Sequence, residues 1–184
     1  MSADLRTRRV ANEFDLLKKL EEANPGVLAV LGRSSGPDGD RVAVAIHQTE
    51  GLVQGGDGLA ACDSHEAEFQ FPELFPAVPI EAFLKRPVFH PNVHPENGFV
   101  CLWSRFSAGD TIIEAVRQLQ RVIRWEVFNS ETDHLMQPEA LAAAANLARP
   151  LAGTAIRVPV DLASERGWRA RTASGRRRLT TPAG

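Results

Sequence analysis

A series of prolines in the middle of the chain constrains the fold more than any other sequence feature. Prolines occupy positions 72, 76, 79, 87 and 91 and alternate with aromatic and aliphatic residues in the stretch FPELFPAVPIEAFLKRPVFHPNV. Proline has no backbone N–H and a fixed φ, and it disfavours helical conformation in the residue before it. We therefore expect a short strand over 80–84, extended or turn backbone elsewhere in this region, and no regular helix.

The residues before this region predict one helix followed by antiparallel strands. Apolar side chains recur at helical spacing over 5–23, and Asn24-Pro25-Gly26 ends that helix. Two β-rich runs, over 27–32 and 41–48, flank the turn sequence SSGPDGD and predict a hairpin, and AEFQF at 67–71 predicts a third strand. The intervening sequence GLVQGGDG is interpreted as a glycine-rich link without the pattern of a phosphate-binding loop.

The residues after the prolines predict two further helices. Asp110-Thr111 is suited to cap a helix with the sequence IIEAVRQLQRVIRW, whose apolar residues fall on one face. Pro138 is favourable in the first turn of an alanine-rich helix that follows. The expected fold class is therefore α+β, with an N-terminal helix, a four-stranded antiparallel meander sheet and C-terminal helices.

Composition excludes several classes of protein. The 184 residues are 43% hydrophobic and 24% charged, which is typical of a globular domain and not of a disordered, collagen-like or coiled-coil chain. No apolar run reaches the roughly 20 residues of a membrane helix, and the N-terminal residues lack a secretory signal, so we expect a cytoplasmic protein without a membrane partner. Two cysteines, Cys62 and Cys101, are too few for a disulfide framework and fit a reducing compartment.

Charge is distributed unevenly along the chain. Residues 149–184 contain eight arginines against two acidic residues, whereas the rest of the chain is acidic. From about residue 168 there are too few large apolar side chains to offset the entropy cost of ordering, so we expect a flexible end. The basic cluster 176–178 is interpreted as part of that solvated end, and we expect no nucleic-acid partner.

A loop between the predicted sheet and the core helix holds the residues that are suited to chemistry. It reads HPNVHPENGFVCLW from His90 to Trp103. The Cys101 thiol is suited to carry an acyl group as a thioester, and the Asn92 amide to donate a hydrogen bond to an oxyanion. Two alternatives remain: a zinc site of His90, His94 and Cys101, for which no fourth ligand is evident, and purely structural roles for His90 and Cys101.

The sequence resembles the ubiquitin-conjugating enzymes over about residues 5–148. The resemblance rests on FQFPELFPAVP, VFHPNV, NGFVCLW and the helix TIIEAVRQLQRVI, in that order. It implies a catalytic core over 1–150 and a C-terminal extension over 151–184. It also implies a protein that needs no cofactor or metal, and that holds ubiquitin or a ubiquitin-like protein as a thioester.

The resemblance also implies roles for individual residues. Cys101 would form the thioester, Asn92 would support the oxyanion or order the loop, and His90 with Pro91 would support the loop structurally. An acidic residue beyond the core helix orients the attacking amine in this family, and NSETDHLMQPEA places Asp133 there, with Glu131 and His134 as neighbouring alternatives. The implied partners are an activating enzyme, a ubiquitin-like protein and a protein target that offers a lysine.

Two departures from the family pattern bear on its ligases. The segment LWSRFSAGD after Cys101 is short and lacks the family's tryptophan-serine-proline-alanine pattern, and Ala77 stands where many members present an aromatic residue. A RING-type ligase would lose its central apolar contact, so we do not expect one as a partner.

The absence of tyrosine and the abundance of alanine and arginine indicate a bacterial conjugation system, with antiphage defence as one setting. The rival interpretation is a non-catalytic module of the same fold that binds ubiquitin-like proteins.

Overall fold

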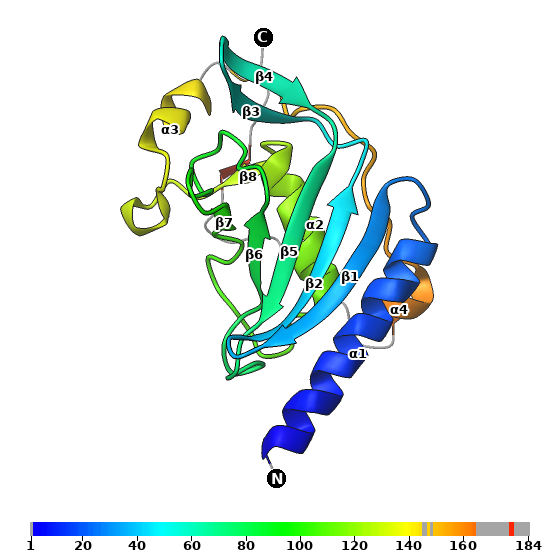
Figure 1. Cartoon of the computed structure of the whole chain (residues 1–184). Coiled ribbons are helices and arrows are strands. Elements are labelled where there is room, and N and C mark those ends of the chain that lie inside the picture. Colours follow the sequence, from blue (N-terminus) through cyan, green and yellow to red (C-terminus); the bar gives the residue numbers. More distant parts are fainter. Residues whose placement is uncertain (1, 145–146, 148, 165–176, 179–184) are drawn as a thin grey trace.

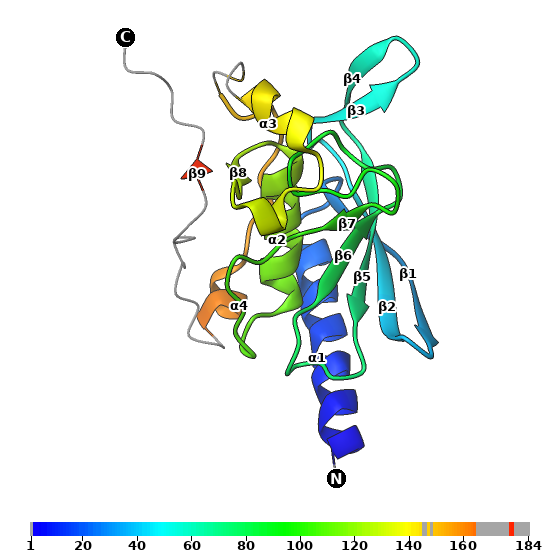
Figure 2. The same ribbon diagram turned by 90° about the vertical axis from the view of Figure 1, so that its left-hand side faces the viewer.

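A five-stranded antiparallel sheet carries helix α2 against one face (Figures 1 and 2). The structure is a computed structural model, and it describes residues 2–144, 147, 149–164 and 177–178. The strands lie in the order β1-β2-β5-β6-β7 and comprise β1 (Leu28–Gly36), β2 (Gly39–Ile46), β5 (His65–Phe71), β6 (Glu81–Leu84) and β7 (Phe99–Val100).

Helices cover the sheet on one side and extend past its ends. They are α1 (Ser2–Glu22), α2 (Ile112–Ile123), α3 (Pro138–Ala144) and α4 (Val160–Ser164), with a 3₁₀ turn at Thr132–His134. Helix α1 runs along the β1 edge, and α3 lies at the opposite end of the molecule from the N-terminus (Figure 1). Among the helices that the structure describes, none combines the length and apolarity needed to cross a membrane.

The start of α2 is fixed by two carboxylates. The Glu114 carboxylate accepts the backbone N–H of Thr111 (2.7 Å), as in a capping box. The carboxylate of Glu13, a fully buried residue of α1, accepts the N–H of Ile112 (2.7 Å). Because these N–H groups have no partner inside the helix, both carboxylates stabilise its N-terminus, and Glu13 also ties α1 to α2.

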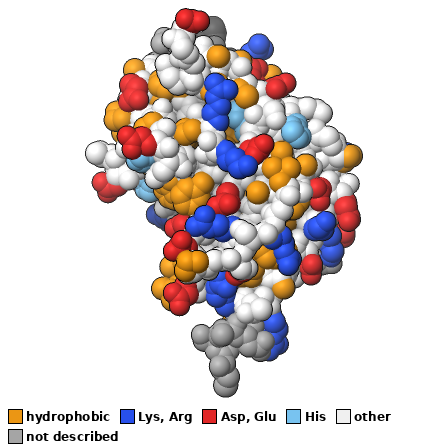
Figure 3. All heavy atoms as spheres, in the orientation of Figure 1, with side chains coloured by type: hydrophobic (Ala, Val, Ile, Leu, Met, Phe, Trp, Pro, Cys, Tyr) orange, Lys and Arg blue, Asp and Glu red, His pale blue; other side chains and the backbone are white. Residues whose placement is uncertain are grey.

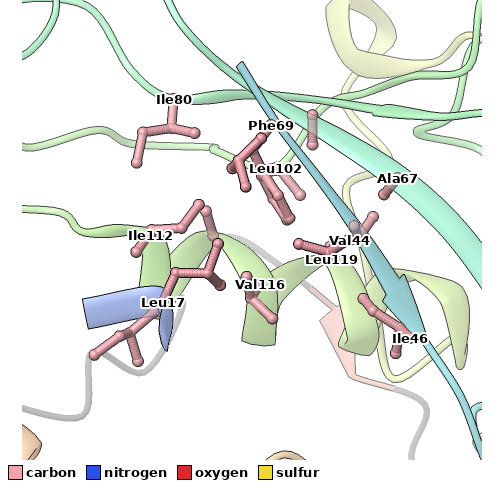
Figure 4. Packing of buried hydrophobic residues seen from close by; sticks show 14 of the residues in the cluster. Leu17, Val44, Ile46, Ala67, Phe69, Ile80, Leu102, Ile112, Val116 and Leu119 are labelled. Carbon is pink, nitrogen blue, oxygen red and sulfur yellow. The ribbon is translucent and has the colours of Figure 1, made fainter. Parts of the chain in front are cut away.

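The main core lies between the sheet and α2. Side chains of β2 and β5 point toward the apolar face of α2 (Figure 4), and Val44, Phe69, Val116 and Leu119 are all 0% exposed. Burying an aliphatic or aromatic side chain of this size contributes about 1.5–3 kcal/mol. The predicted α+β class, N-terminal helix and antiparallel sheet are confirmed, with the short β7 added to the four expected strands.

The glycine-rich link expected over residues 51–58 is instead part of a hairpin, so that prediction was wrong. Strands β3 (Gly51–Gly55) and β4 (Gly58–Cys62) pair antiparallel and project from one end of the sheet (Figure 2). Gly58 has φ +113°, which glycine adopts without strain, so the glycines that suggested an irregular link make the tight turn of the hairpin.

Residues 151–164 continue the packed structure. They pass along the side of α2 that faces away from the sheet (Figure 2), where Ile156 and Leu162 are buried in the main core. The Gln120 amide of α2 holds them by donating to the Thr154 carbonyl (2.8 Å) and accepting the Ile156 N–H (3.0 Å). A further short pair joins β8 (Val127–Phe128) to β9 (Arg177–Arg178). The flexibility predicted from about residue 168 concerns positions that, β9 apart, lie outside the described residues.

Candidate active site

The imidazole of His90 lies beneath the His-Pro-Asn loop and is fully buried. Its Nδ1 accepts the backbone N–H of Asn92 (3.1 Å), so the ring hydrogen is assigned to Nε2, which donates to the Val127 carbonyl (3.2 Å). The ring also packs edge-on against Trp125, 4.8 Å between centroids. These contacts hold the loop against the segment that follows α2.

A second set of contacts joins the loop to the segment before α3. The Pro91 carbonyl accepts the N–H of Met136 (2.8 Å). The buried Gln137 side chain donates to the carbonyls of Val88 (3.0 Å) and Val93 (2.8 Å). The backbone on both sides of Asn92 is therefore tied to residues 136 and 137.

The Asn92 side chain is buried and forms three hydrogen bonds. Its Nδ2 donates to the carbonyls of Asn129 (2.8 Å) and His134 (2.9 Å), and its Oδ1 accepts the N–H of Asn129 (2.6 Å). Both amide hydrogens are thus used within the protein. In this arrangement the Asn92 side chain ties its own loop to residues 129–134.

Cys101 directly follows β7, and a glycine turn sets its place. Gly98 has φ +72°, and a Cβ there would lie 1.9 Å from the Leu84 carbonyl oxygen, so only glycine fits. Val100 then bridges to Val93, and the Cys101 N–H donates to the Asn92 carbonyl (2.9 Å). The cysteine is fixed next to Asn92 although nine positions separate them.

The Cys101 thiol is half-buried and has an imidazole beside it. Its Sγ lies 2.9 Å from Nδ1 of His134 and 3.8 Å from the Trp103 carbonyl oxygen. The His134 side chain is 24% exposed, and its Nε2 lies 3.6 Å from a carboxylate oxygen of Glu131. A partly accessible thiol next to a base is chemically suited to nucleophilic attack on an acyl group.

The structure places the acidic candidate Asp133 in the 3₁₀ turn, as an exposed residue immediately before His134. The sequence names His134 and Glu131 only as alternatives to Asp133, yet His134 is the residue within hydrogen-bond distance of the sulfur. Asn129, which pairs with Asn92, is absent from the sequence-based candidates. Its only sequence signal is its place just after the apolar residues Val127 and Phe128.

The histidines of the alternative zinc site have other partners. Nδ1 of His94 accepts the N–H groups of Glu96 (3.3 Å) and Asn97 (3.4 Å), and both ring nitrogens of His90 contact backbone groups. Within the part of the chain that the structure describes, no cluster of three histidine, cysteine or acidic residues is arranged to hold a metal ion.

The second cysteine lies in a different part of the molecule. Cys62 ends the projecting strand β4, and its Sγ lies 3.1 Å from the Ser64 carbonyl oxygen. On the face of the molecule drawn in Figure 3, the basic and acidic side chains of the described residues are interspersed and do not form separate positive and negative patches.

Comparison with known proteins identifies the fold. No protein-family model matches the chain, and no curated protein matches it by sequence. A solved structure from Trypanosoma cruzi, described as a ubiquitin-conjugating enzyme, matches with a TM-score of 0.51 and 17% identity, over 88% of this chain and 94% of that one.

Two further structures match less closely. Human ubiquitin-conjugating enzyme E2 G1 gives a TM-score of 0.43 at 20% identity, over 61% of this chain and 92% of that one. Ubiquitin-conjugating enzyme E2 UbcA1 from Agrocybe aegerita gives 0.46 at 17% identity, over 76% and 92%. The Trypanosoma cruzi match shows that this chain has the fold of a ubiquitin-conjugating enzyme.

Proposed function

We propose that this protein is a ubiquitin-conjugating enzyme that carries a ubiquitin-like protein on Cys101 as a thioester and transfers it to a lysine amine of a protein target. The observation that carries the proposal is the half-buried Cys101 thiol, held by Asn92 at the end of β7, with an imidazole at 2.9 Å. The fold and the sequence NGFVCLW support the same function.

The reaction consists of two acyl transfers. The Cys101 sulfur attacks the thioester that links the ubiquitin-like protein to a cysteine of the activating enzyme, and that cysteine leaves as a thiolate. The amine of the target then attacks the Cys101 thioester and releases the sulfur. ATP is consumed by the activating enzyme, so the chain itself needs no cofactor.

Asn92 and Asp133 assist the second transfer. Asn92 keeps the 129–134 segment against the thiol, and it reaches an oxyanion on the thioester by exchanging one of its two donated hydrogen bonds. Asp133 is exposed, and its carboxylate orients the incoming amine. His90 and Pro91 hold the loop in place.

The proposed setting is a bacterial, cytoplasmic ubiquitin-like conjugation pathway, with antiphage defence as one role. The enzyme works with an activating enzyme and without a RING-type ligase. In support, the face that many family members present to a ligase carries Ala77, a small exposed side chain, and Trp103 donates its indole N–H to the Ile80 carbonyl (2.8 Å). If a RING domain accelerates discharge of the thioester, the proposal that the enzyme works without a RING-type ligase is wrong.

The test is a charging assay on the full chain. The protein is incubated with ATP, an activating enzyme and the ubiquitin-like protein of the same gene neighbourhood, and the products are separated on a non-reducing gel. We expect a shifted band that reductant removes, in the parent and in Cys62→Ser, but not in Cys101→Ala. Cys62→Ser is the matched control because it removes the other thiol.

The outcome separates the enzyme from its rival. Charging that persists in Cys101→Ala would refute the assigned thioester residue. A parent that binds the ubiquitin-like protein reversibly but forms no reductant-sensitive band would instead be a binding module of this fold.

A further inference from the structure

The Cys101 thiol and the His134 imidazole form a close pair although 33 positions separate them in the chain. The distance of 2.9 Å from Sγ to Nδ1 is within hydrogen-bond range. An isolated thiol is only a few per cent ionised at neutral pH, and a neighbouring imidazole raises that fraction by accepting the proton. With 24% of its side chain exposed, His134 is also within reach of an incoming nucleophile.

The other nitrogen of the imidazole faces a carboxylate. Nε2 lies 3.6 Å from Oε2 of Glu131, an ion-pair distance, and Glu131 is 68% exposed, so water screens the attraction. The Asn129 side chain accepts the Glu131 N–H (2.9 Å) and holds the start of this turn. The order thiol, imidazole, carboxylate is the arrangement in which a base is oriented toward a nucleophile.

The backbone of His134 is anchored from two sides. Its carbonyl accepts from Nδ2 of Asn92 (2.9 Å), and its N–H donates to the Glu131 carbonyl (2.9 Å). The next anchor is the bond from the Met136 N–H to the Pro91 carbonyl (2.8 Å). The imidazole is therefore positioned by the same loop that positions the thiol.

We propose that His134 is the general base of this enzyme, that it accepts the Cys101 proton, and that Glu131 is a positioning residue for its imidazole. The proposal rests on the function proposed above and deepens it. It assigns the proton transfer to a histidine in the turn where the sequence suggests an acidic residue.

The proton transfers balance in both steps. During charging, the thiol proton moves to Nδ1 of His134 as the sulfur bonds to the incoming carbonyl carbon, and the departing donor thiolate takes that proton. During discharge, the attacking amine gives a proton to Nδ1 as its nitrogen bonds to the carbonyl carbon. The bond from that carbon to Sγ breaks, and the Cys101 thiolate regains the proton.

The test measures thiol reactivity directly, with iodoacetamide, in a Cys62→Ser background so that only Cys101 reacts. We expect His134→Gln to lower the alkylation rate constant about tenfold at pH 7 and less than twofold at pH 10, where any thiol is ionised. Glu131→Gln should lower it about twofold to threefold at pH 7 and leave it unchanged at pH 10. A structural role alone would not produce this dependence on pH.

Other titratable groups on the same turn and on the His-Pro-Asn loop are Asp133, His90 and His94. His94→Gln is the matched control, because it removes an imidazole from the loop without touching the sulfur, and it should leave the rate unchanged. If His134→Gln unfolds, the pH profile of the Cys62→Ser protein decides: reactivity already high between about pH 6 and 8 supports the pair. A single rise above pH 8 overturns it.

The proposal is overturned if His134→Gln alkylates as fast as its parent at pH 7. Because alkylation needs no activating enzyme, its outcome is independent of charging. A parent that never charges but shows the His134-dependent alkylation would refute the conjugating function and keep the thiol–imidazole pair. A parent that charges, but whose alkylation does not depend on His134, would keep the conjugating function and refute the thiol–imidazole pair.

Discussion

At the scale of single residues, the site depends on a buried amide. Asn92 is 2% exposed and connects three partners: the two carbonyls of Asn129 and His134 and the N–H of Asn129. A primary amide offers two donors and one carbonyl oxygen, and all of these are used. The Asn92 amide therefore determines the position of the His134 imidazole relative to the Cys101 thiol.

We predict that Asn92→Ala destabilises the protein and slows discharge while charging continues. Three buried polar groups lose their partner, so the free energy of unfolding should fall by about 2–3 kcal/mol in urea titrations. Discharge of the thioester to free lysine should slow because the 129–134 segment loses its anchor. Asn97→Ala is the control, since Asn97 is exposed and its side chain accepts the Phe99 N–H (2.9 Å). Equal stability and equal discharge in Asn92→Ala would contradict the assignment.

At the scale of elements, the projecting β3–β4 hairpin is fixed at its base by a buried histidine. His65 begins β5 and is 4% exposed. Its Nε2 contacts the carbonyls of Thr49 (2.9 Å), just before the hairpin, and of Cys62 (3.1 Å), its last residue. Burial lowers the pKa of His65 below its usual 6.5, and the hydrogen bonds to the two carbonyls offset part of that decrease.

This lowered pKa predicts how stability depends on pH. Below pH 6.5 the unfolded chain binds a proton at His65 that the folded chain does not, so acidification favours unfolding. The free energy of unfolding should therefore fall as pH decreases from 7.5 to 5.5, and the contribution of His65 should be complete above 6.5. Urea titrations of His65→Gln should show a flatter dependence on pH than those of the parent. An unchanged slope in His65→Gln would disprove the link.

At the scale of the whole molecule, the segment 151–164 covers the side of α2 that faces away from the sheet. Ile156 and Leu162 are each 3% exposed in the main core. Asn24, at the end of α1, exchanges hydrogen bonds with the backbone of Arg157 through its amide (2.8 and 2.9 Å). The segment is thus packed as part of the domain, although the sequence places it in an extension.

We predict that a chain ending at residue 150 is much less stable than one ending at 164. Each buried aliphatic side chain contributes about 1.5–3 kcal/mol, and the hydrogen bonds to Asn24 and Gln120 are lost as well. The expected decrease in Tm is about 10 °C or more, measured by circular dichroism. The chain ending at 164 keeps both side chains and serves as the control. Equal Tm values would show that the segment adds nothing to the core.

Local patterns predicted most of the fold, and long-range contacts limited the prediction of the site. Helical periodicity identified α1 and α2, and β-rich runs next to turn sequences identified β2 and β5. The β3–β4 hairpin was missed because its glycines mask two short strands. The pairing of His134 with Cys101 was not predicted, because it depends on Asn92 reaching across the loop to residues 129 and 134. The roles of Cys101, Asn92 and Asp133 stay predictions for the assays above.

The separation between Cys101 and its imidazole has a consequence for newly made protein. When the ribosome has just added Cys101, neither α2 nor His134 has been translated. His134 reaches the sulfur only after α2 has packed against the sheet. The nascent thiol therefore keeps the low reactivity of any unfolded cysteine. Its sensitivity to oxidants and to acyl donors begins only when the domain is complete, so reactivity at this position reports that folding has finished.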